Sequence, residues 1–210
     1  MIMNNEKIIS VRPIPEYFSL TWMLGSRCNY DCMYCPAELH DSTSQPHDLE
    51  TMQQVWKNIY EKTQQKNLPY KISFTGGEVT ANKNFLPLTK WLRSTYSDIA
   101  MILLTTNGSA SRRYYEELSE HVESISFSTH SEFMDEKHFF ETVVAVNHLM
   151  PRPKKSVHVN VMDEYWNQDR ISIYKKWLDQ HNVSYTVNSI NYEQAVRTNI
   201  LQKGKQNLEV

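Results

Sequence analysis

Short apolar runs rich in β-type residues alternate along the chain with longer segments whose apolar residues recur at helical spacing. This alternation predicts strands separated by amphipathic helices. The predicted strands span residues 17–24, 70–74, 99–104, 124–128, 157–162 and 183–190. The predicted helices lie between them, at residues 49–60, 85–96, 111–122, 139–150 and 171–178. Asp48 and Ser111 stand where N-caps are expected for the first and third of these helices.

A strand–helix–strand series of this kind favours a parallel sheet with right-handed crossovers. A closed barrel of such units needs eight of them and about 250 residues, whereas this sequence has 210 residues. We therefore predict an α/β fold that is a partial (β/α)6 barrel, open on one side. We expect residues 1–210 to form a single domain, with an N-terminal extension at 1–16 and a polar C-terminal tail at 191–210.

Residues that can carry chemistry follow most of the predicted strands. In parallel α/β folds such residues gather at the carboxyl edge of the sheet, where active sites are built. The segments in question are 28–35, 76–78, 106–108, 129–130 and 163–164. They are expected to converge on one rim.

Composition and charge restrict the class of protein. The net charge of −2 gives no reason to expect a nucleic-acid partner. The first ten residues lack the apolar core of a signal peptide. No stretch approaches the roughly 18 apolar residues of a membrane-spanning helix. We therefore expect a cytoplasmic protein without a membrane partner.

The sequence has three cysteines, all within one short run: Cys28, Cys32 and Cys35. An odd number in so tight a cluster does not resemble a disulfide scaffold and indicates a metal site. A cubane [4Fe–4S] cluster normally has four cysteine ligands. With no fourth cysteine, one iron would stay open for another ligand. The alternative is a structural zinc site completed by His40 or His47, in a non-enzymatic binding module stabilised by zinc or a cluster.

The C-x-x-x-C-x-aromatic-C run after the first strand resembles the motif of radical S-adenosylmethionine (SAM) enzymes. The resemblance covers nearly the whole chain, because that family has a (β/α)6 partial barrel. It implies that Cys28, Cys32 and Cys35 each bind one iron of a [4Fe–4S] cluster. It also implies that the fourth iron chelates the amino and carboxylate groups of SAM, and that the backbone of Tyr34 lies beside the adenine.

Gly76, Gly77 and Glu78 follow the second predicted strand and are similar to the Gly-Gly-Glu motif of the same family. Alone, such a tripeptide would be an ordinary turn. Glycines let the backbone approach a ligand closely, and a carboxylate accepts hydrogen bonds from an ammonium group. The resemblance implies that this motif contacts the SAM amino group. The family usually has proline next, whereas this chain has Val79.

Three further residues follow the third and fourth strands. Asn107, in a Thr-Asn-Gly segment similar to one in the family, is either a cofactor-side residue or part of a plain turn. The resemblance implies polar contacts from Ser128 to the ribose and carboxylate of SAM. His130 is either a catalytic acid/base group for the substrate or a polar rim residue.

The fifth strand departs from the family pattern. Many members carry a Gly-x-Ile-x-Gly-like stretch that packs near adenine, whereas this chain has the sequence HVNVM at 158–162. Asn160 is the residue that can offer an amide to the ribose.

The resemblance implies an enzyme that reductively cleaves SAM and uses the 5′-deoxyadenosyl radical to abstract hydrogen from a substrate. An electron donor such as flavodoxin or ferredoxin is then implied. The lack of further cysteines argues against an auxiliary cluster domain in this chain. The sequence leaves the substrate open between a small metabolite, a peptide and a partner protein.

Overall fold

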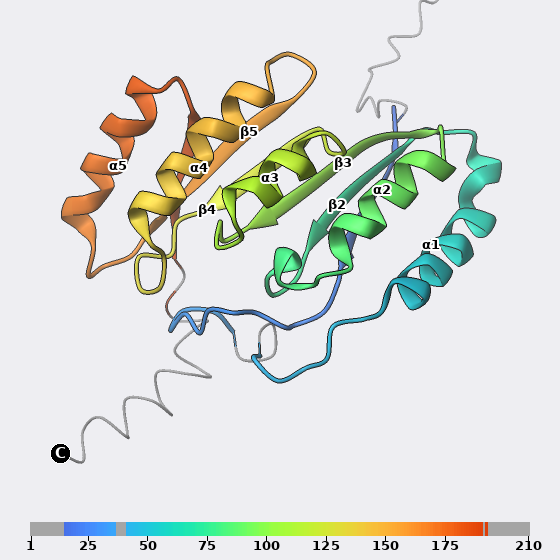
Figure 1. Ribbon diagram of the computed structural model, residues 1–210, viewed down its shortest axis with the longest axis horizontal. Coiled ribbons are helices and arrows are strands. Elements are labelled where there is room, and N and C mark those ends of the chain that lie inside the picture. The colour runs from blue at the N-terminus through green and yellow to red at the C-terminus, as the bar shows by residue number, and fades with distance from the viewer. Residues whose placement is uncertain (1–14, 37–40, 191, 193–210) are drawn as a thin grey trace, which may run out of the picture.

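The computed structural model describes residues 15–36, 41–190 and 192 (Figure 1). Six strands form one sheet in the order β1-β2-β3-β4-β5-β6, and every neighbouring pair is parallel. The strands are β1 (Phe18–Met23), β2 (Tyr70–Thr75), β3 (Ile99–Thr106), β4 (Ser124–Ser128), β5 (Ser156–Asp163) and β6 (Ser184–Ser189). Since β1 and β6 are the two edges, the predicted partial barrel is confirmed.

A helix follows each of the first five strands. These helices are α1 (Leu49–Thr63), α2 (Phe85–Thr95), α3 (Arg112–Ser119), α4 (Glu136–Leu149) and α5 (Gln168–Gln180), with short 3-10 turns η2 (Gln64–Lys66) and η3 (Val79–Ala81). Asp48 and Ser111 cap α1 and α3 as expected, accepting hydrogen bonds from the amides of Thr51 and Tyr114. None of the described helices is long and apolar enough to cross a bilayer.

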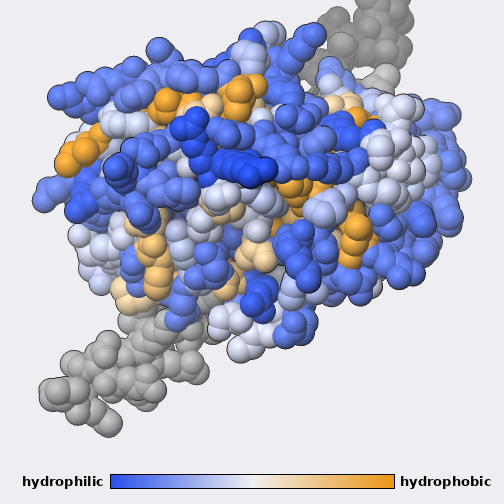
Figure 2. Space-filling model, in the orientation of Figure 1, coloured by the Kyte–Doolittle hydropathy of each residue, from blue (hydrophilic) through white to orange (hydrophobic). Residues whose placement is uncertain are grey.

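The core lies between the sheet and a single layer of helices. In Figure 1 the five helices lie side by side over one face of the sheet. Alternate residues of the central strands are buried toward that layer, for example Ile102 in β3 and Phe127 in β4. The surface of the helix side is mainly hydrophilic, with scattered apolar patches (Figure 2). This pattern is that of amphipathic helices, with one apolar face on the sheet and the other face in water.

The inner face of the partial barrel is polar along β4, β5 and β6. Ser124, Ser126 and Ser128 of β4 lie beside Ser156, His158 and Asn160 of β5. His158 and Asn160 in turn lie beside Ser184 and Thr186 of β6, and the side chain of Asn188 donates a hydrogen bond to that of Asn160. A closed barrel fills its interior with bulky branched side chains. Along β4–β6 the inner face of this sheet instead presents mainly uncharged hydrogen-bonding groups.

Leu118 of α3 tests the core directly, because it is completely buried. Replacing it with alanine should lower the free energy of unfolding by about 2–5 kcal/mol through lost burial and a residual cavity. The measurement is urea unfolding at equilibrium. Ile173→Ala is the control, since Ile173 on α5 is 63% exposed and its loss should change stability little. Equal effects of the two substitutions would contradict this packing.

Candidate active site

The cysteine loop (residues 24–36) leaves β1 at the carboxyl edge of the sheet. Its first part is fixed by two backbone bonds to one residue: the Cys28 amide donates to the Asp41 carbonyl at 2.7 Å, and the Asp41 amide donates to the Ser26 carbonyl at 2.8 Å. Farther on, the Cys35 amide donates to the Cys32 carbonyl at 3.0 Å. The bonds to Asp41 tie the start of the loop to the segment that follows it, and the Cys35–Cys32 bond closes a turn between these two cysteines.

All three cysteines line one cavity of about 280 Å³ at the strand ends. None of them forms a disulfide; Cys32 is 5% exposed, and the other two are partly exposed. The residues predicted from the motifs line the same cavity: Tyr34, Gly76, Gly77, Glu78, Asn107, Ser128 and His130. Of the predicted site residues only Asn160 is not in this lining, and it lies beside Ser128. The expected convergence of the strand ends is therefore present.

In the described part of the chain, the candidate zinc ligands are not found in this cavity. His40 lies outside the described residues, and His47 is exposed and lines a neighbouring cavity rather than this one. Within the described ranges, no three side chains of His, Cys, Asp or Glu converge on a single metal-ion position. A set of three thiols on a rim cavity matches the ligand chemistry of an iron–sulfur cluster, which cysteine thiolates hold.

Gly76 and Gly77 face the backbone of the cysteine loop. The Gly77 amide donates to the Gly25 carbonyl at 2.9 Å, and the Glu78 amide donates to the Arg27 carbonyl at 2.8 Å. A Cβ on Gly77 would lie 2.2 Å from the Arg27 carbonyl oxygen, and one on Gly76 would lie 2.4 Å from that of Gly25. Gly76 also has a φ of +137°, which disfavours other residues. The glycines therefore let the cysteine loop approach the end of β2.

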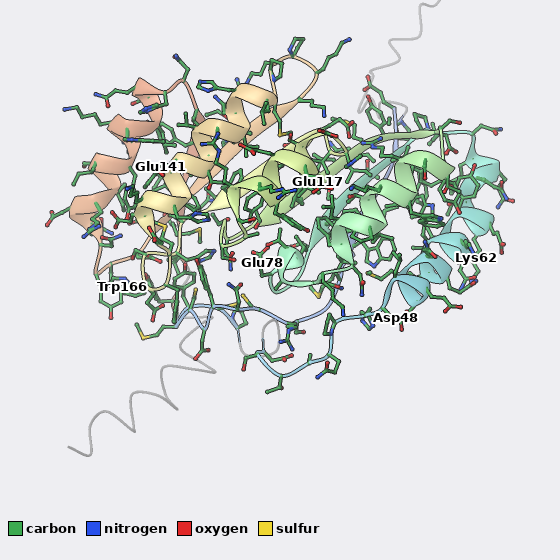
Figure 3. All side chains as sticks on the ribbon, in the orientation of Figure 1. Asp48, Lys62, Glu78, Glu117, Glu141 and Trp166 are labelled. Atoms are coloured by element: carbon green, nitrogen blue, oxygen red, sulfur yellow. The ribbon has the colours of Figure 1, made fainter. Side chains whose placement is uncertain are left out.

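Glu78 is buried, with 3% of its surface exposed. Its Oε1 accepts hydrogen bonds from the amide and hydroxyl of Thr80 and from the Thr106 hydroxyl, and its Oε2 accepts from the Asn107 amide at 2.6 Å. Burial raises the pKa of the Glu78 carboxyl, although the bonds from Asn107 and Thr80 oppose that effect. The carboxylate joins the ends of β2 and β3 and lines the cavity (Figure 3).

Asn107 belongs to both a turn and the site. Gly108 after it has a φ of +75°, as the Asn-Gly turn predicts. The Asn107 side chain meanwhile donates to Oδ1 of Asn29 in the cysteine loop at 3.0 Å. Together with its amide bond to Glu78, this contact makes Asn107 the link between the carboxylate and the loop.

Ser128 and Asn160 lie side by side on the inner face of the sheet. Nδ2 of the Asn160 side chain donates to the Ser128 hydroxyl at 3.3 Å. Oδ1 of the same side chain accepts from Nδ2 of Asn188 at 3.2 Å. Ser128 is 7% exposed at the end of β4. These neutral groups can donate and accept hydrogen bonds without bringing charge to the cavity.

Tyr34 and His130 form the other wall of the site. Their rings stack at 5.9 Å between centroids, and the Tyr34 hydroxyl lies 2.5 Å from Nδ1 of His130. The same Nδ1 is 3.5 Å from Sγ of Cys32. Burial lowers the pKa of His130 to about 4. The imidazole is therefore neutral near pH 7, and one of its ring nitrogens can accept a hydrogen bond.

The surroundings of Cys28 and Cys32 favour the protonated thiol over the reactive thiolate. Burial raises the pKa of Cys28, and the carboxylate of Glu78 adds to that rise. Burial also raises the pKa of Cys32, with Glu132 and the neighbouring cysteines adding to it. Metal ions bind thiolates, so loading a metal here must displace protons. A metal-free site of this kind favours thiols over reactive thiolates.

Two carboxylates contact the cysteine loop without having been assigned a role from the sequence. Glu132 accepts a hydrogen bond from the Met33 amide at 3.0 Å. Glu164, after β5, accepts one from the Tyr34 hydroxyl at 3.0 Å. The only sequence indication was the place of Glu164 directly after a predicted strand, which locates a residue on the rim but does not give its partner.

Solved structures resemble this fold at low sequence identity. Streptococcus suis SuiB, bound to the precursor peptide SuiA, has a TM-score of 0.61 at 14% identity, covering 83% of this chain and 40% of SuiB. The protein anSMEcpe with bound AdoMet has a TM-score of 0.56 at 16% identity, covering 84% of this chain and 50% of that protein. BtrN in complex with AdoMet and 2-DOIA has 0.52 at 16%, covering 83% and 70%.

The chain thus spans 40% of the length of SuiB. None of the curated proteins compared matches it significantly. The model of the radical SAM superfamily matches residues 22–146, more than half of the chain, and includes the cysteine loop and the ends of β2, β3 and β4. This chain therefore belongs to the radical SAM superfamily.

Proposed function

We propose that this protein is a radical SAM enzyme that holds a [4Fe–4S] cluster on Cys28, Cys32 and Cys35 and binds SAM in the adjoining cavity. Its superfamily membership supports SAM-dependent radical chemistry. The observation that carries the finer proposal is the shared cavity, which the three cysteines line together with the strand-end residues. Because the sequence has no fourth cysteine, one iron would be left without a protein thiolate.

The proposal assigns the contacts with SAM to residues in and beside this cavity. Glu78 is the fixed carboxylate of the site, and we assign it to the SAM ammonium group. Ser128 is assigned to the ribose and carboxylate, and Asn160, whose side chain donates to the Ser128 hydroxyl, is assigned to the ribose. The backbone of Tyr34 is assigned to the adenine. Gly76 and Gly77 keep the cysteine loop close to Glu78.

When bound, the cluster supplies the electron that cleaves SAM to methionine and a 5′-deoxyadenosyl radical, which abstracts a hydrogen atom from the substrate. The protein's part is to bind, orient and exclude water. Cys32 is buried and His130 is partly buried, so bound SAM in the cavity would cover what remains exposed of this wall. His130 stays neutral near pH 7, and we propose it as the candidate acid/base group on the substrate side. An external donor such as flavodoxin or ferredoxin would reduce the cluster.

The inner face of β4–β6 supports a substrate with neutral polar groups. Its side chains are uncharged, and many already bond to one another, as His158 does to Ser184 at 3.1 Å and to Thr186 at 3.0 Å. Such a surface fits a substrate segment with hydroxyl or amide groups better than a strongly charged one. A small metabolite, a peptide and a partner protein all remain compatible with that chemistry. SuiB bound to SuiA and BtrN with 2-DOIA are structural precedents for a peptide and a small molecule.

Anaerobic reconstitution with iron and sulfide tests the proposal. We expect a brown protein with about four irons per chain, which loses its colour in air and forms 5′-deoxyadenosine from SAM when dithionite is added. Zinc loading under matched conditions is the comparison. A colourless protein that takes up one zinc tightly, and no iron, would instead identify a non-enzymatic binding module.

A further inference from the structure

We propose that Glu164 is a positioning residue that holds the cysteine loop against the ends of β4 and β5 through the hydroxyl of Tyr34. The restraint on the loop is a property of the protein without any cofactor. Its consequence for a cluster rests on the proposed function. Glu164 follows β5 directly, whereas Tyr34 lies between Cys32 and Cys35, so the contact joins residues 130 positions apart.

Glu164 differs from a surface carboxylate in its burial and in the number of hydrogen bonds that it accepts. Glu164 is buried, with 1% of its surface exposed. It accepts hydrogen bonds from the Tyr34 hydroxyl at 3.0 Å, from the Ser131 amide at 3.2 Å and from the Ser131 hydroxyl. No ion pair joins it to another residue in the described part of the chain. Buried charge without a counter-ion is costly unless hydrogen bonds satisfy it, and these donors do so.

Tyr34 is held by its ring as well as by its hydroxyl. The ring lies near those of His130 and Trp166, at centroid distances of 5.9 and 6.3 Å and interplanar angles of 15° and 30°. The indole of Trp166 donates to the Ser131 hydroxyl at 3.2 Å, so the same serine serves both Glu164 and the stacking ring. Figure 3 shows Trp166 near the loops at the carboxyl edge of the sheet.

The position of Tyr34 makes this restraint act on the cysteines. Tyr34 is adjacent to Cys35 and two residues from Cys32, which has an amide–carbonyl bond with Cys35. A displaced Tyr34 would therefore move both thiols. Glu132, which accepts from the Met33 amide, ties the loop at a neighbouring point but reaches the backbone rather than a side chain. Glu164 thus sets the orientation of the second half of the loop.

The test compares Glu164→Gln with a matched carboxylate elsewhere. Glutamine keeps the shape, but its NH₂ group donates where Tyr34 and Ser131 also donate, so acceptor capacity is lost. Glu123→Gln is the control: Glu123 accepts from the Ile102 amide at 2.7 Å and pairs with Arg93, at the opposite edge of the sheet. It alters a hydrogen-bonded, partly buried carboxylate without touching the loop.

The first readout is amide hydrogen exchange of the full-length, metal-free protein. Glu164→Gln should raise exchange in segment 28–35 by about tenfold, the size expected for loss of a buried charge-assisted hydrogen bond. Glu123→Gln should not raise exchange selectively there. Tyr34→Phe should also raise exchange there, because it removes the bond to Glu164 together with the contact to Nδ1 of His130. The double substitution should raise exchange by less than the two separate effects combined, because the two changes share the Tyr34–Glu164 bond. If Glu164→Gln folds poorly, Tyr34→Phe still tests the contact between the loop and Glu164.

The second readout is the reconstituted protein. Glu164→Gln should lower iron content or change the electron paramagnetic resonance spectrum of the reduced cluster, whereas Glu123→Gln should leave both unchanged. Wild-type exchange in segment 28–35, or an equal rise in all segments, would overturn the proposal. If the wild type takes up no iron, the proposed function fails, but the exchange result still decides the role of Glu164.

Discussion

Replacing Cys32 with alanine is expected to reduce the formation of 5′-deoxyadenosine from SAM to the background level of the protein-free reaction. Cys32 is the most buried of the three cysteines that line the cavity. Its loss leaves two thiolates where a cluster with one open iron needs three. The measurement is iron content after anaerobic reconstitution, followed by product formation with dithionite as reductant.

Two controls separate loss of a ligand from loss of the fold. Thermal unfolding of the metal-free Cys32→Ala protein should show a cooperative transition, because only a small side chain is removed. Met33→Leu changes the next residue but keeps the backbone amide that donates to Glu132. It should retain iron and product formation. Full SAM cleavage by Cys32→Ala would rule out the assignment of Cys32 as a cluster ligand.

The fifth strand of this fold was predictable because it repeats a simple local pattern. The predicted strand at 157–162 corresponds to β5, Ser156–Asp163, whose Val157, Val159 and Val161 are buried toward the helices. Alternation of buried apolar and inward polar residues identifies such a strand without knowledge of its neighbours. The parallel order of the sheet then follows from the helices between the strands.

Helix ends were less predictable, because an apolar residue past a helix end looks like part of the helix. The third helix was predicted to reach residue 122, but α3 ends at Ser119. Val122 is buried all the same, since it packs into the core from the turn before β4. Burial alone therefore extends a helix pattern by a few residues when the following turn also faces the core.

The site shows the same division between local pattern and distant contact. Motif spacing places Gly76 and Gly77 on the rim, and the structure confirms that they line the cavity. What spacing does not reveal is that an added Cβ at either position would meet the backbone of the cysteine loop. The contact of Glu164 with Tyr34 is of the same kind. Each depends on which two loops meet at the rim, which no short window of sequence contains.

Gly77→Ala tests the closest of these approaches and should prevent stable cluster assembly. The new methyl group would lie 2.2 Å from the Arg27 carbonyl oxygen and 2.4 Å from that of Ser26, which are backbone atoms without rotamer freedom. Either the cysteine loop or the end of β2 must move. Overpacking of this kind typically costs about 1–3 kcal/mol. A shift of the loop would also separate the cysteines from Glu78, so iron content after reconstitution should fall severalfold.

Gly25→Ala is the control that separates backbone strain from overlap. Gly25 has a φ of +132°, but a Cβ there would meet no atom within 4 Å. This substitution should lower stability through strain, by about 1–3 kcal/mol, while the space between the loop and β2 is kept. Urea unfolding of the metal-free proteins and iron content of the reconstituted proteins provide the comparison.

If Gly77→Ala keeps its iron while Gly25→Ala loses it, backbone conformation rather than the close approach governs the loop. If neither variant loses iron, the packing of the cysteine loop against Gly77 is not needed for the cluster site. If Gly25→Ala retains its iron and Gly77→Ala does not, the role of Gly77 is to let the cysteine loop and the end of β2 meet.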